Sequence, residues 1–194
     1  SYLNEVFEKH GKPMKCKLDI GSLLSSLKKY EYFLIKRDTP YNPPSFPSSY
    51  AVGKDLDVIV KKVDLKHVKE EVTSFAEKNK GKFNLNIIEE KNGFRVRFEE
   101  NDMLHYQIDV STSVPGVSEK FLQKCFEEKL LVNRAFYELP TRYEAVLRVA
   151  SLSRKPSKIH HYVFLRNNIS KIELDVFEDS NHRTMVEEFI RSNS

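Results

Sequence analysis

The segment GKDLDVIVKK, residues 53–62, constrains the fold most strongly, because two acids stand directly before an uninterrupted apolar run. The run Val58–Val60 predicts a buried strand over residues 55–61. In an extended strand, residues two apart point to the same face, so Asp55 and Asp57 lie side by side and repel each other unless a cation lies between them. The pattern therefore indicates a strand that carries a divalent metal site at its start.

Composition limits the classes of protein to consider. The chain has 194 residues, 40% of them hydrophobic, which suits one large domain or two small ones with a substantial core. A net charge of +4 is too small an excess to indicate a nucleic-acid binder. Cys16 and Cys125 show no disulfide or zinc spacing, and no apolar run approaches the ~20 residues of a membrane span. We therefore expect a cytoplasmic protein without a membrane span, with nucleic acid unlikely as a partner.

The periodicity of apolar residues predicts an α/β (α+β) fold in which helices flank a mixed sheet. A helix that begins near Leu18 leads to a strand at Tyr32–Ile35, and a loop rich in proline and serine, residues 39–54, then leads to Asp55. An amphipathic helix with Asp64 at its N-cap follows the acidic strand. Residues 82–90, 93–100 and 103–112 alternate and are separated by turn signals, which predicts an antiparallel extension of the sheet.

A third acid, Asp109, lies in the last of these predicted strands. Its neighbours Ile108 and Val110 point to the opposite, apolar face, so Asp109 is free to join Asp55 and Asp57. Carboxylate oxygens are the ligands that Mg²⁺ prefers, and metal ions in phosphoryl chemistry neutralise phosphate charge and lower the pKa of an attacking hydroxyl. The three acids together predict a metal centre that acts on a phosphate ester.

With these motifs, residues 18–112 resemble the DNA polymerase beta-like nucleotidyltransferase superfamily. The segment DLDVIV matches its acid-x-acid strand, which implies that Asp55 and Asp57 are metal ligands, and QIDV matches its third acid, which implies that Asp109 is a ligand of the catalytic metal. The resemblance implies Mg²⁺, or Mn²⁺, as cofactor and a nucleoside triphosphate such as ATP as substrate. It implies transfer of a nucleoside monophosphate to a hydroxyl acceptor, with Asp109 helping to activate that hydroxyl.

More narrowly, the segments YFLIKRDTP, GKDLDVIV and LHYQIDVS, followed by FYELPTRYEAVLRVASLSRKPSKIHHYVFL, look like those of bacterial nucleotidyltransferase-like proteins linked to surface-polysaccharide pathways. Because the pattern of the chain changes at Ser118, we expect residues 1–117 to form the nucleotidyltransferase-like catalytic domain. Residues 118–194, where helical spacing prevails and only the segment RAFYEL is predicted as extended, form a mostly helical domain that closes the cleft.

The chain departs from the superfamily pattern at the phosphate-binding loop. No Gly-Ser pair stands shortly before Asp55, because Gly21 and Ser22 open the first predicted helix instead. Substitutes come from the strand end and the following loop, and a second group comes from a predicted helix in the tail. Cations and exposed backbone N–H groups are what a phosphate needs. The candidates are Lys36, Arg37, Ser48, Ser49, Gly53 and Lys54 near the acids, with Lys158 and His161, and beside them Lys155 and His160, in the tail.

Two other functions remain open from the residues alone. One is a protein that keeps the fold and binds nucleotides or partner proteins but has lost turnover together with the Gly-Ser loop. The other is a regulator that modifies protein side chains. Among single residues, Lys36 and Arg37 also fit a solvated strand end, and His105 is expected on the same face as Asp109, either as its partner or as a structural residue.

Overall fold

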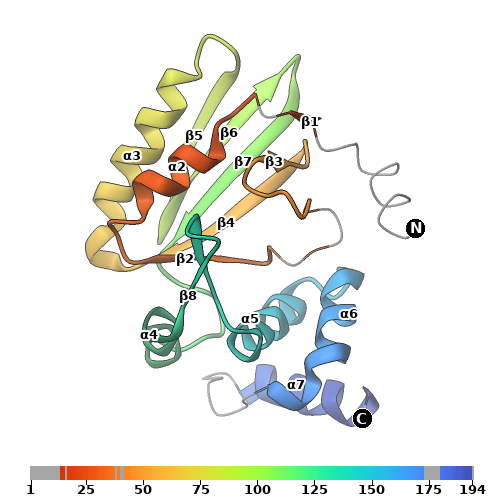
Figure 1. Cartoon of the computed structure of the whole chain (residues 1–194). Helices are drawn as coiled ribbons and strands as arrows, with labels where there is room; N and C mark the ends of the chain where they lie inside the picture. Colours follow the sequence, from red (N-terminus) through yellow and green to blue (C-terminus); the bar gives the residue numbers. More distant parts are fainter. Residues whose placement is uncertain (1–13, 16, 38, 40–41, 173–179, 194) are drawn as a thin grey trace. The chain divides into compact units, whose positions relative to one another are not determined.

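The computed structural model of the chain describes residues 14–15, 17–37, 39, 42–172 and 180–193 (Figure 1). The chain forms two compact units, of which the first comprises Ser1–Thr112 with Leu131–Tyr137 and the second Ser113–Leu130 with Glu138–Ser194. Cys16 lies outside the described residues, and Cys125 is buried in the second unit. The segment 131–137 thus returns to the first unit after the chain has begun the second.

A seven-stranded mixed sheet forms the centre of the first unit. Its strand order is β5-β6-β7-β4-β2-β9-β8, and β4 runs parallel to β7 while the pairs β2–β4, β5–β6 and β6–β7 are antiparallel. This confirms the predicted mixed α/β class. The strands are β2 (Tyr32–Ile35), β4 (Lys54–Val60), β5 (Asn84–Glu90), β6 (Gly93–Glu100), β7 (Met103–Ser111), β8 (Leu130–Val132) and β9 (Phe136–Glu138), and a separate small sheet pairs β1 (Met14–Lys15) with β3 (Ser49–Tyr50).

Two helices, α2 (Ile20–Leu27) and α3 (Leu65–Lys78), cover one face of the sheet (Figure 1). Asp19 caps α2 by accepting a hydrogen bond from the backbone N–H of Ser22 at 3.0 Å, so Ser22 does lie in the first turn of a helix, as predicted. A 3₁₀ turn, Lys62–Asp64, precedes α3. Asp64 holds the N-cap position, but its carboxylate accepts from the backbone N–H of Glu31 at 3.0 Å and thereby ties the helix to the start of β2.

Alternation along β6 and β7 divides apolar from polar side chains. Three residues of β6 and three of β7 are at most 1% exposed and belong to the core on the helix side: Phe94, Val96, Phe98, Tyr106, Ile108 and Val110. Each buried side chain of this size contributes about 1.5–3 kcal/mol through apolar burial. The residues between them, including Arg95, Gln107 and Asp109, therefore point to the opposite face of the sheet, which we call the polar face.

The hairpin between β6 and β7 contains an irregularity that sets the register of the polar face. Asn101 and Asp102 have φ of 52° and 60°, as a two-residue type I′ turn requires, and Glu99 is paired with Leu104. Continued without a shift, this register would place Arg95 opposite Ile108. Phe98 instead pairs with Tyr106, so that one residue of β7 is extra and Arg95 lies opposite Asp109.

His105 is that extra residue. It is buried against the ring of Phe83, with centroids 4.7 Å apart, and its Nε2 lies 2.7 Å from the hydroxyl of Tyr50. Phe83 and Tyr50 both belong to the core. The expectation that His105 shares a face with Asp109 is therefore wrong, because the bulge interrupts the alternation on which it rested.

Helices dominate the second unit, which agrees with the helical carboxyl-terminal part predicted for the fold, whereas the domain bounds 1–117 and 118–194 stay a prediction. The helices are α4 (Glu119–Glu128), α5 (Thr141–Arg154), α6 (Ile159–Asn168) and α7 (Ser180–Asn193), with a 3₁₀ turn at Ile169–Lys171. Arg148 is fully buried and donates from Nε to Glu144 at 2.9 Å, and its Nη1 lies 3.1 Å from Nδ1 of His161.

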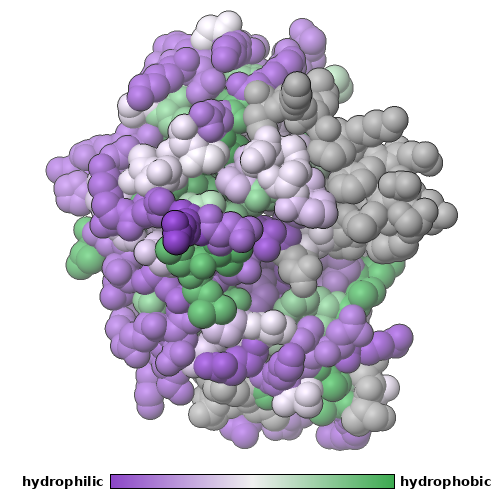
Figure 2. All heavy atoms as spheres, in the orientation of Figure 1, coloured by the Kyte–Doolittle hydropathy of each residue, from purple (hydrophilic) through white to green (hydrophobic). Residues whose placement is uncertain are grey.

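Among the helices in the described ranges, none has the length and apolar character needed to cross a membrane. Figure 2 shows mainly hydrophilic residues on the visible face, with a hydrophobic group over β8, where Leu130 and Leu131 are exposed.

Candidate metal centre

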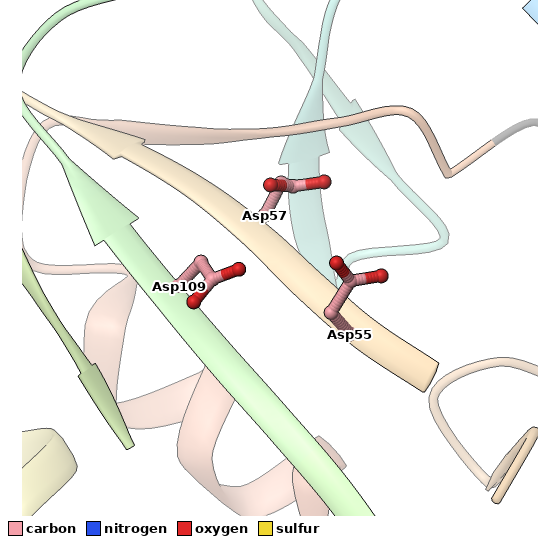
Figure 3. Close-up of side chains that lie close together, drawn as sticks. All are labelled: Asp55, Asp57 and Asp109. Atoms are coloured by element: carbon pink, nitrogen blue, oxygen red, sulfur yellow. The ribbon is translucent and has the colours of Figure 1, made fainter. Parts of the chain in front are cut away.

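Asp55, Asp57 and Asp109 meet at the centre of the sheet. The parallel pairing of β4 with β7 puts Asp57 directly opposite Asp109, and Asp55 lies two residues earlier on the same face of β4. One carboxylate oxygen from each of the three residues lies within 4.8 Å of the others. Figure 3 shows the three side chains projecting on the same side of the two strands. The convergence predicted from the sequence is thus present in the structure.

The strand register explains why these acids stay out of the core. On β4, Leu56, Val58 and Val60 belong to the buried cluster on the helix side. A shift of one residue would turn this apolar set to the polar face and bury Asp55 and Asp57, which the core would not tolerate. The same alternation that builds the core therefore fixes the position of the carboxylates.

Burial and neighbouring charges both act on the carboxylate of Asp57. Burial raises the pKa of Asp57, the charge of Lys36 lowers it, and the charges of Asp55 and Asp109 raise it, with a net increase above the ordinary aspartate value. Its side chain keeps 20% of its surface accessible, so water still moderates the effect of burial. Asp57 is thus harder to ionise than an ordinary aspartate, and a nearby cation would favour its ionised form.

Two cationic side chains already contact the cluster. Lys36 follows β2, and its Nζ lies 3.3 Å from Oδ2 of Asp57. Lys36 has φ of 56°, a left-handed backbone conformation that favours glycine. On the other side of the cluster, Arg95 donates from Nε to Oδ1 of Asp109 at 2.6 Å, and this hydrogen bond raises the pKa of Arg95. Cations therefore flank the acids from β2 and from β6.

Gln107 is a second hydrogen-bond donor to Asp109. Neither Gln107 nor Arg95 was predicted from the sequence as a partner of Asp109. The side-chain amide of Gln107 lies 3.2 Å from Oδ1 and 3.0 Å from Oδ2 of Asp109. Gln107 could have been recognised from the strand alternation, because it lies two residues before Asp109. Arg95 could not, because its pairing with Asp109 depends on the bulge at His105.

The other loop residues predicted for phosphate binding lie in the first unit. The guanidinium of Arg37 lies 5.1 Å from the centroid of the Phe136 ring, a cation–π contact. Ser48 is exposed, Ser49 is in β3 and contacts the hydroxyl of Ser45, and Lys54 begins β4. Gly53 has φ of 78° and donates its N–H to the carbonyl of His105 at 2.8 Å. Phosphate binding by these residues stays a prediction.

The tail residues predicted to contact a nucleotide belong to the second unit. Lys155 follows α5 and Lys158 holds the N-cap position of α6, while His160 and His161 lie in the first turn of α6. The rings of the two histidines have centroids 4.2 Å apart. His161 is 0% exposed beside Arg148, so its surroundings are those of the helical core. A nucleotide contact from this group stays a prediction.

The chemistry of the donor set fits a hard divalent cation. Three carboxylates from two adjacent strands supply only oxygen ligands, as Mg²⁺ and Mn²⁺ prefer, and a site that is partly open leaves room for water or phosphate oxygens. Because three negative charges repel one another in this geometry, a divalent ion would relieve a cost that Lys36 and Arg95 offset only in part.

Comparisons with known proteins add a distant structural likeness. No protein-family model and no curated protein matches the chain. The polyadenylate synthase of Megavirus is similar with 10% identity and a TM-score of 0.34, over 97% of this chain and 37% of that one. Terminal uridylyl transferase 4 from Trypanosoma brucei is similar with 12% identity and TM-scores of 0.34 with bound GTP and 0.30 with bound CTP.

The alignments to those two uridylyl transferase structures cover 97% of this chain and 68% and 69% of theirs. The chain spans little more than a third of the Megavirus enzyme. With TM-scores this low, the likeness carries no inference about activity. The narrower placement among polysaccharide-linked bacterial proteins gains no support from these structures.

Proposed function

We propose that the protein is a Mg²⁺-dependent nucleotidyltransferase that moves a nucleoside monophosphate from a nucleoside triphosphate to a hydroxyl acceptor in the cytoplasm. The observation that supports this proposal is the meeting of Asp55, Asp57 and Asp109 on one face of β4 and β7. In the reaction, the acceptor oxygen forms a bond to the α-phosphorus, the bond to pyrophosphate breaks, and the acceptor proton passes to the carboxylate of Asp109.

Each acid has a distinct role in this proposal. Asp55 and Asp57, on the same strand, would hold Mg²⁺ together with the triphosphate. Mg²⁺, when bound, neutralises phosphate charge and lowers the pKa of the acceptor hydroxyl. Asp109, on the neighbouring strand, would complete the metal site and would orient and activate that hydroxyl, and its contacts with Arg95 and Gln107 keep the carboxylate in place. No covalent enzyme intermediate is required.

The test is calorimetric titration with ATP in the presence and absence of MgCl₂, combined with a pyrophosphate-release assay over a panel of hydroxyl acceptors. We expect nucleotide binding that depends on Mg²⁺ and release of pyrophosphate with at least one acceptor. Absence of any Mg²⁺-dependent binding of ATP, GTP, CTP and UTP would contradict the proposal. Glycerol and simple sugars, which carry accessible hydroxyl groups, are suitable first members of the acceptor panel.

One observation favours a second function, in which the protein binds nucleotides or partner proteins without turnover. Lys36 and Arg95 already place cationic groups against Asp57 and Asp109, and the loop between β2 and β4 has no Gly-Ser pair. A protein that binds nucleotides or partners without turnover would show this combination. Binding of a nucleotide without pyrophosphate release from any acceptor would favour this second function.

Lys36 offers a direct test of how the triphosphate is held. The change Lys36→Ala should weaken ATP binding about tenfold or more while affecting adenosine binding little, because a charge-assisted contact contributes about 1.5–3 kcal/mol. The measurement is calorimetry with ATP and adenosine on the same preparation. Lys28→Ala, which removes a lysine that donates to the carbonyl of Arg134, serves as control. Equal losses for ATP and adenosine would contradict a phosphate contact.

A further inference from the structure

Two arginines lie on β6, the strand next to that of Asp109, and both are on the polar face of the sheet. Arg95 and Arg97 are two residues apart on β6, and their Cα partners on β7 are Asp109 and Gln107. Both arginine side chains are 36% exposed, whereas Val96 between them is fully buried on the helix side. The two guanidinium groups therefore share the face that holds the three carboxylates.

The strand order places these arginines and Lys36 on opposite sides of the three aspartates. The proposed triphosphate contact is on the side of Lys36. Along β6-β7-β4-β2, the acids occupy the two inner strands, Lys36 follows the outer strand β2, and Arg95 and Arg97 lie on the outer strand β6. Lys36 contacts Asp57, while Arg95 contacts Asp109. If Lys36 receives the triphosphate and Asp109 the acceptor hydroxyl, the arginines lie next to the acceptor.

Both guanidinium groups keep donors that no group of the described residues uses. Arg95 donates from Nε to Asp109, and its Nη2 lies 3.3 Å from Glu90; the Nη2 of Arg97 lies 3.2 Å from Glu99. Within the part of the chain that the structure describes, the buried Nε of Arg97 has no hydrogen-bond acceptor. A buried N–H without an acceptor is disfavoured, and a small rotation of Arg97 towards a ligand oxygen would relieve this cost.

The acidic neighbours of the arginines do not close the site to an anion. The side chains of Glu90 and Glu99 are 45% and 27% exposed, and ion pairs this accessible to water contribute little to stability. A guanidinium presents five N–H donors in a plane that matches phosphate oxygens. A phosphate dianion can therefore compete with Glu90 and Glu99 for the guanidinium donors more readily than a ligand with a single carboxylate can.

We propose that Arg95 and Arg97 form the acceptor subsite and that the acceptor is a small molecule carrying a phosphate monoester beside its reactive hydroxyl. This subsite rests on the proposed nucleotidyl transfer, because the arginines are assigned to the acceptor only if Asp109 binds the acceptor hydroxyl in that reaction. Its phosphate contacts would hold the acceptor on the β6 side of the acids, so that the hydroxyl faces Asp109 while the triphosphate is held from the β2 side.

The experiment titrates the ¹⁵N-labelled full chain with inorganic phosphate, without Mg²⁺ and at constant ionic strength, and follows the Nε–Hε signals of arginine by NMR. Saturable shifts are expected for Arg95 and Arg97, and weaker ones with acetate. Arg97 is the diagnostic position, because it contacts none of the three aspartates. Arg97→Gln should lower phosphate affinity about tenfold, and Arg97→Lys should retain part of it, since lysine keeps the charge but not the planar fork.

Two further variants test whether the phosphate affinity and the phosphate-induced NMR shifts arise at Arg95 and Arg97. Arg142→Gln removes an arginine that also pairs with an exposed glutamate, Glu128 at 3.6 Å, and should leave phosphate affinity unchanged. Lys36→Ala should leave the phosphate shifts at Arg97 in place, because Lys36 belongs to the other side of the cluster. Absence of saturable shifts at Arg95 and Arg97, or equal losses in Arg97→Gln and Arg142→Gln, would overturn the subsite. A response to a short single-stranded RNA without one to inorganic phosphate would overturn the small acceptor.

Failure of the subsite and failure of the proposed function are distinguishable. Calorimetry with Mg²⁺ and ATP should give the same nucleotide affinity for Arg97→Gln as for the parent. If the parent binds Mg²⁺–ATP but phosphate does not shift the arginine signals, only the subsite is wrong. If the parent does not bind Mg²⁺–ATP, the nucleotidyl transfer is wrong, and with it the assignment of the arginines to an acceptor.

Discussion

Replacing Asp57 with asparagine should remove Mg²⁺-linked nucleotide binding while leaving the fold intact. The asparagine would keep the shape of the side chain on β4 but lose the charge that a hard cation requires. Loss of a partner that merely orients a metal ligand typically lowers metal affinity about 10–100-fold, so loss of a direct ligand should cost at least as much. Calorimetry with ATP and MgCl₂, alongside circular dichroism, measures both parts of this result.

The same variant has an expected effect on stability that depends on pH. Because the pKa of Asp57 is raised in the folded protein, the native state is favoured by protonation of this group, and that contribution is lost as pH rises through the folded pKa. Without metal, Asp57→Asn should therefore melt at a higher temperature than the parent at neutral pH. The difference should shrink as pH falls towards the ordinary range of an aspartate.

Glu70→Gln is the matched control, because it removes a negative charge from an exposed position on α3. It should change neither the Mg²⁺-linked binding nor the pH dependence of melting. An Asp57→Asn protein that binds metal and nucleotide like the parent would show that Asp57 is not a ligand.

Replacing Asp109 with asparagine should separate chemistry from binding. Asp55 and Asp57 would still hold the nucleotide, so most triphosphate affinity should remain. Turnover should fall about 10²–10⁴-fold, because orientation and deprotonation of the acceptor hydroxyl matter in the transition state and contribute little to ground-state binding. The new side-chain amide still offers Arg95 an oxygen, so the flanking contact can persist.

The measurement is triphosphate affinity and pyrophosphate release on one preparation of Asp109→Asn, with the acceptor found in the panel. A loss confined to kcat is the expected pattern. Turnover that survives while affinity is lost would contradict the assignment, since it would make Asp109 a nucleotide-binding residue and leave the acceptor without a base.

Local periodicity predicted the framework of the first unit well. The strand Tyr32–Ile35, the acidic strand and the three β-segments between residues 84 and 111 all form, because each has a buried face that its alternation or apolar run specifies. The short strand β8 was not predicted, since Leu130 and its neighbours follow a helical spacing in the sequence. Its pairing depends on the rest of the sheet, which no local pattern reveals.

The bulge at His105 marks the limit of register prediction. The two-residue turn at Asn101 and Asp102 calls for one register, and the apolar faces of β6 and β7 call for another that differs by one residue. The extra residue satisfies both demands. The three acids could be found from alternation within single strands, but the contact of Arg95 with Asp109 follows from resolving this conflict and needed the structure.

The left-handed backbone of Lys36 implies a trade-off between stability and function at one position. A residue with a Cβ in this conformation costs roughly 1 kcal/mol, and the change Lys36→Gly would avoid that cost. Glycine, however, would leave Asp57 without its lysine contact and the proposed triphosphate without a cation. Relief of backbone strain and loss of the contact with Asp57 therefore oppose each other in the stability of Lys36→Gly. Selection for nucleotide use acts on the cation, so a variant library screened for nucleotide use should retain a lysine or arginine at residue 36.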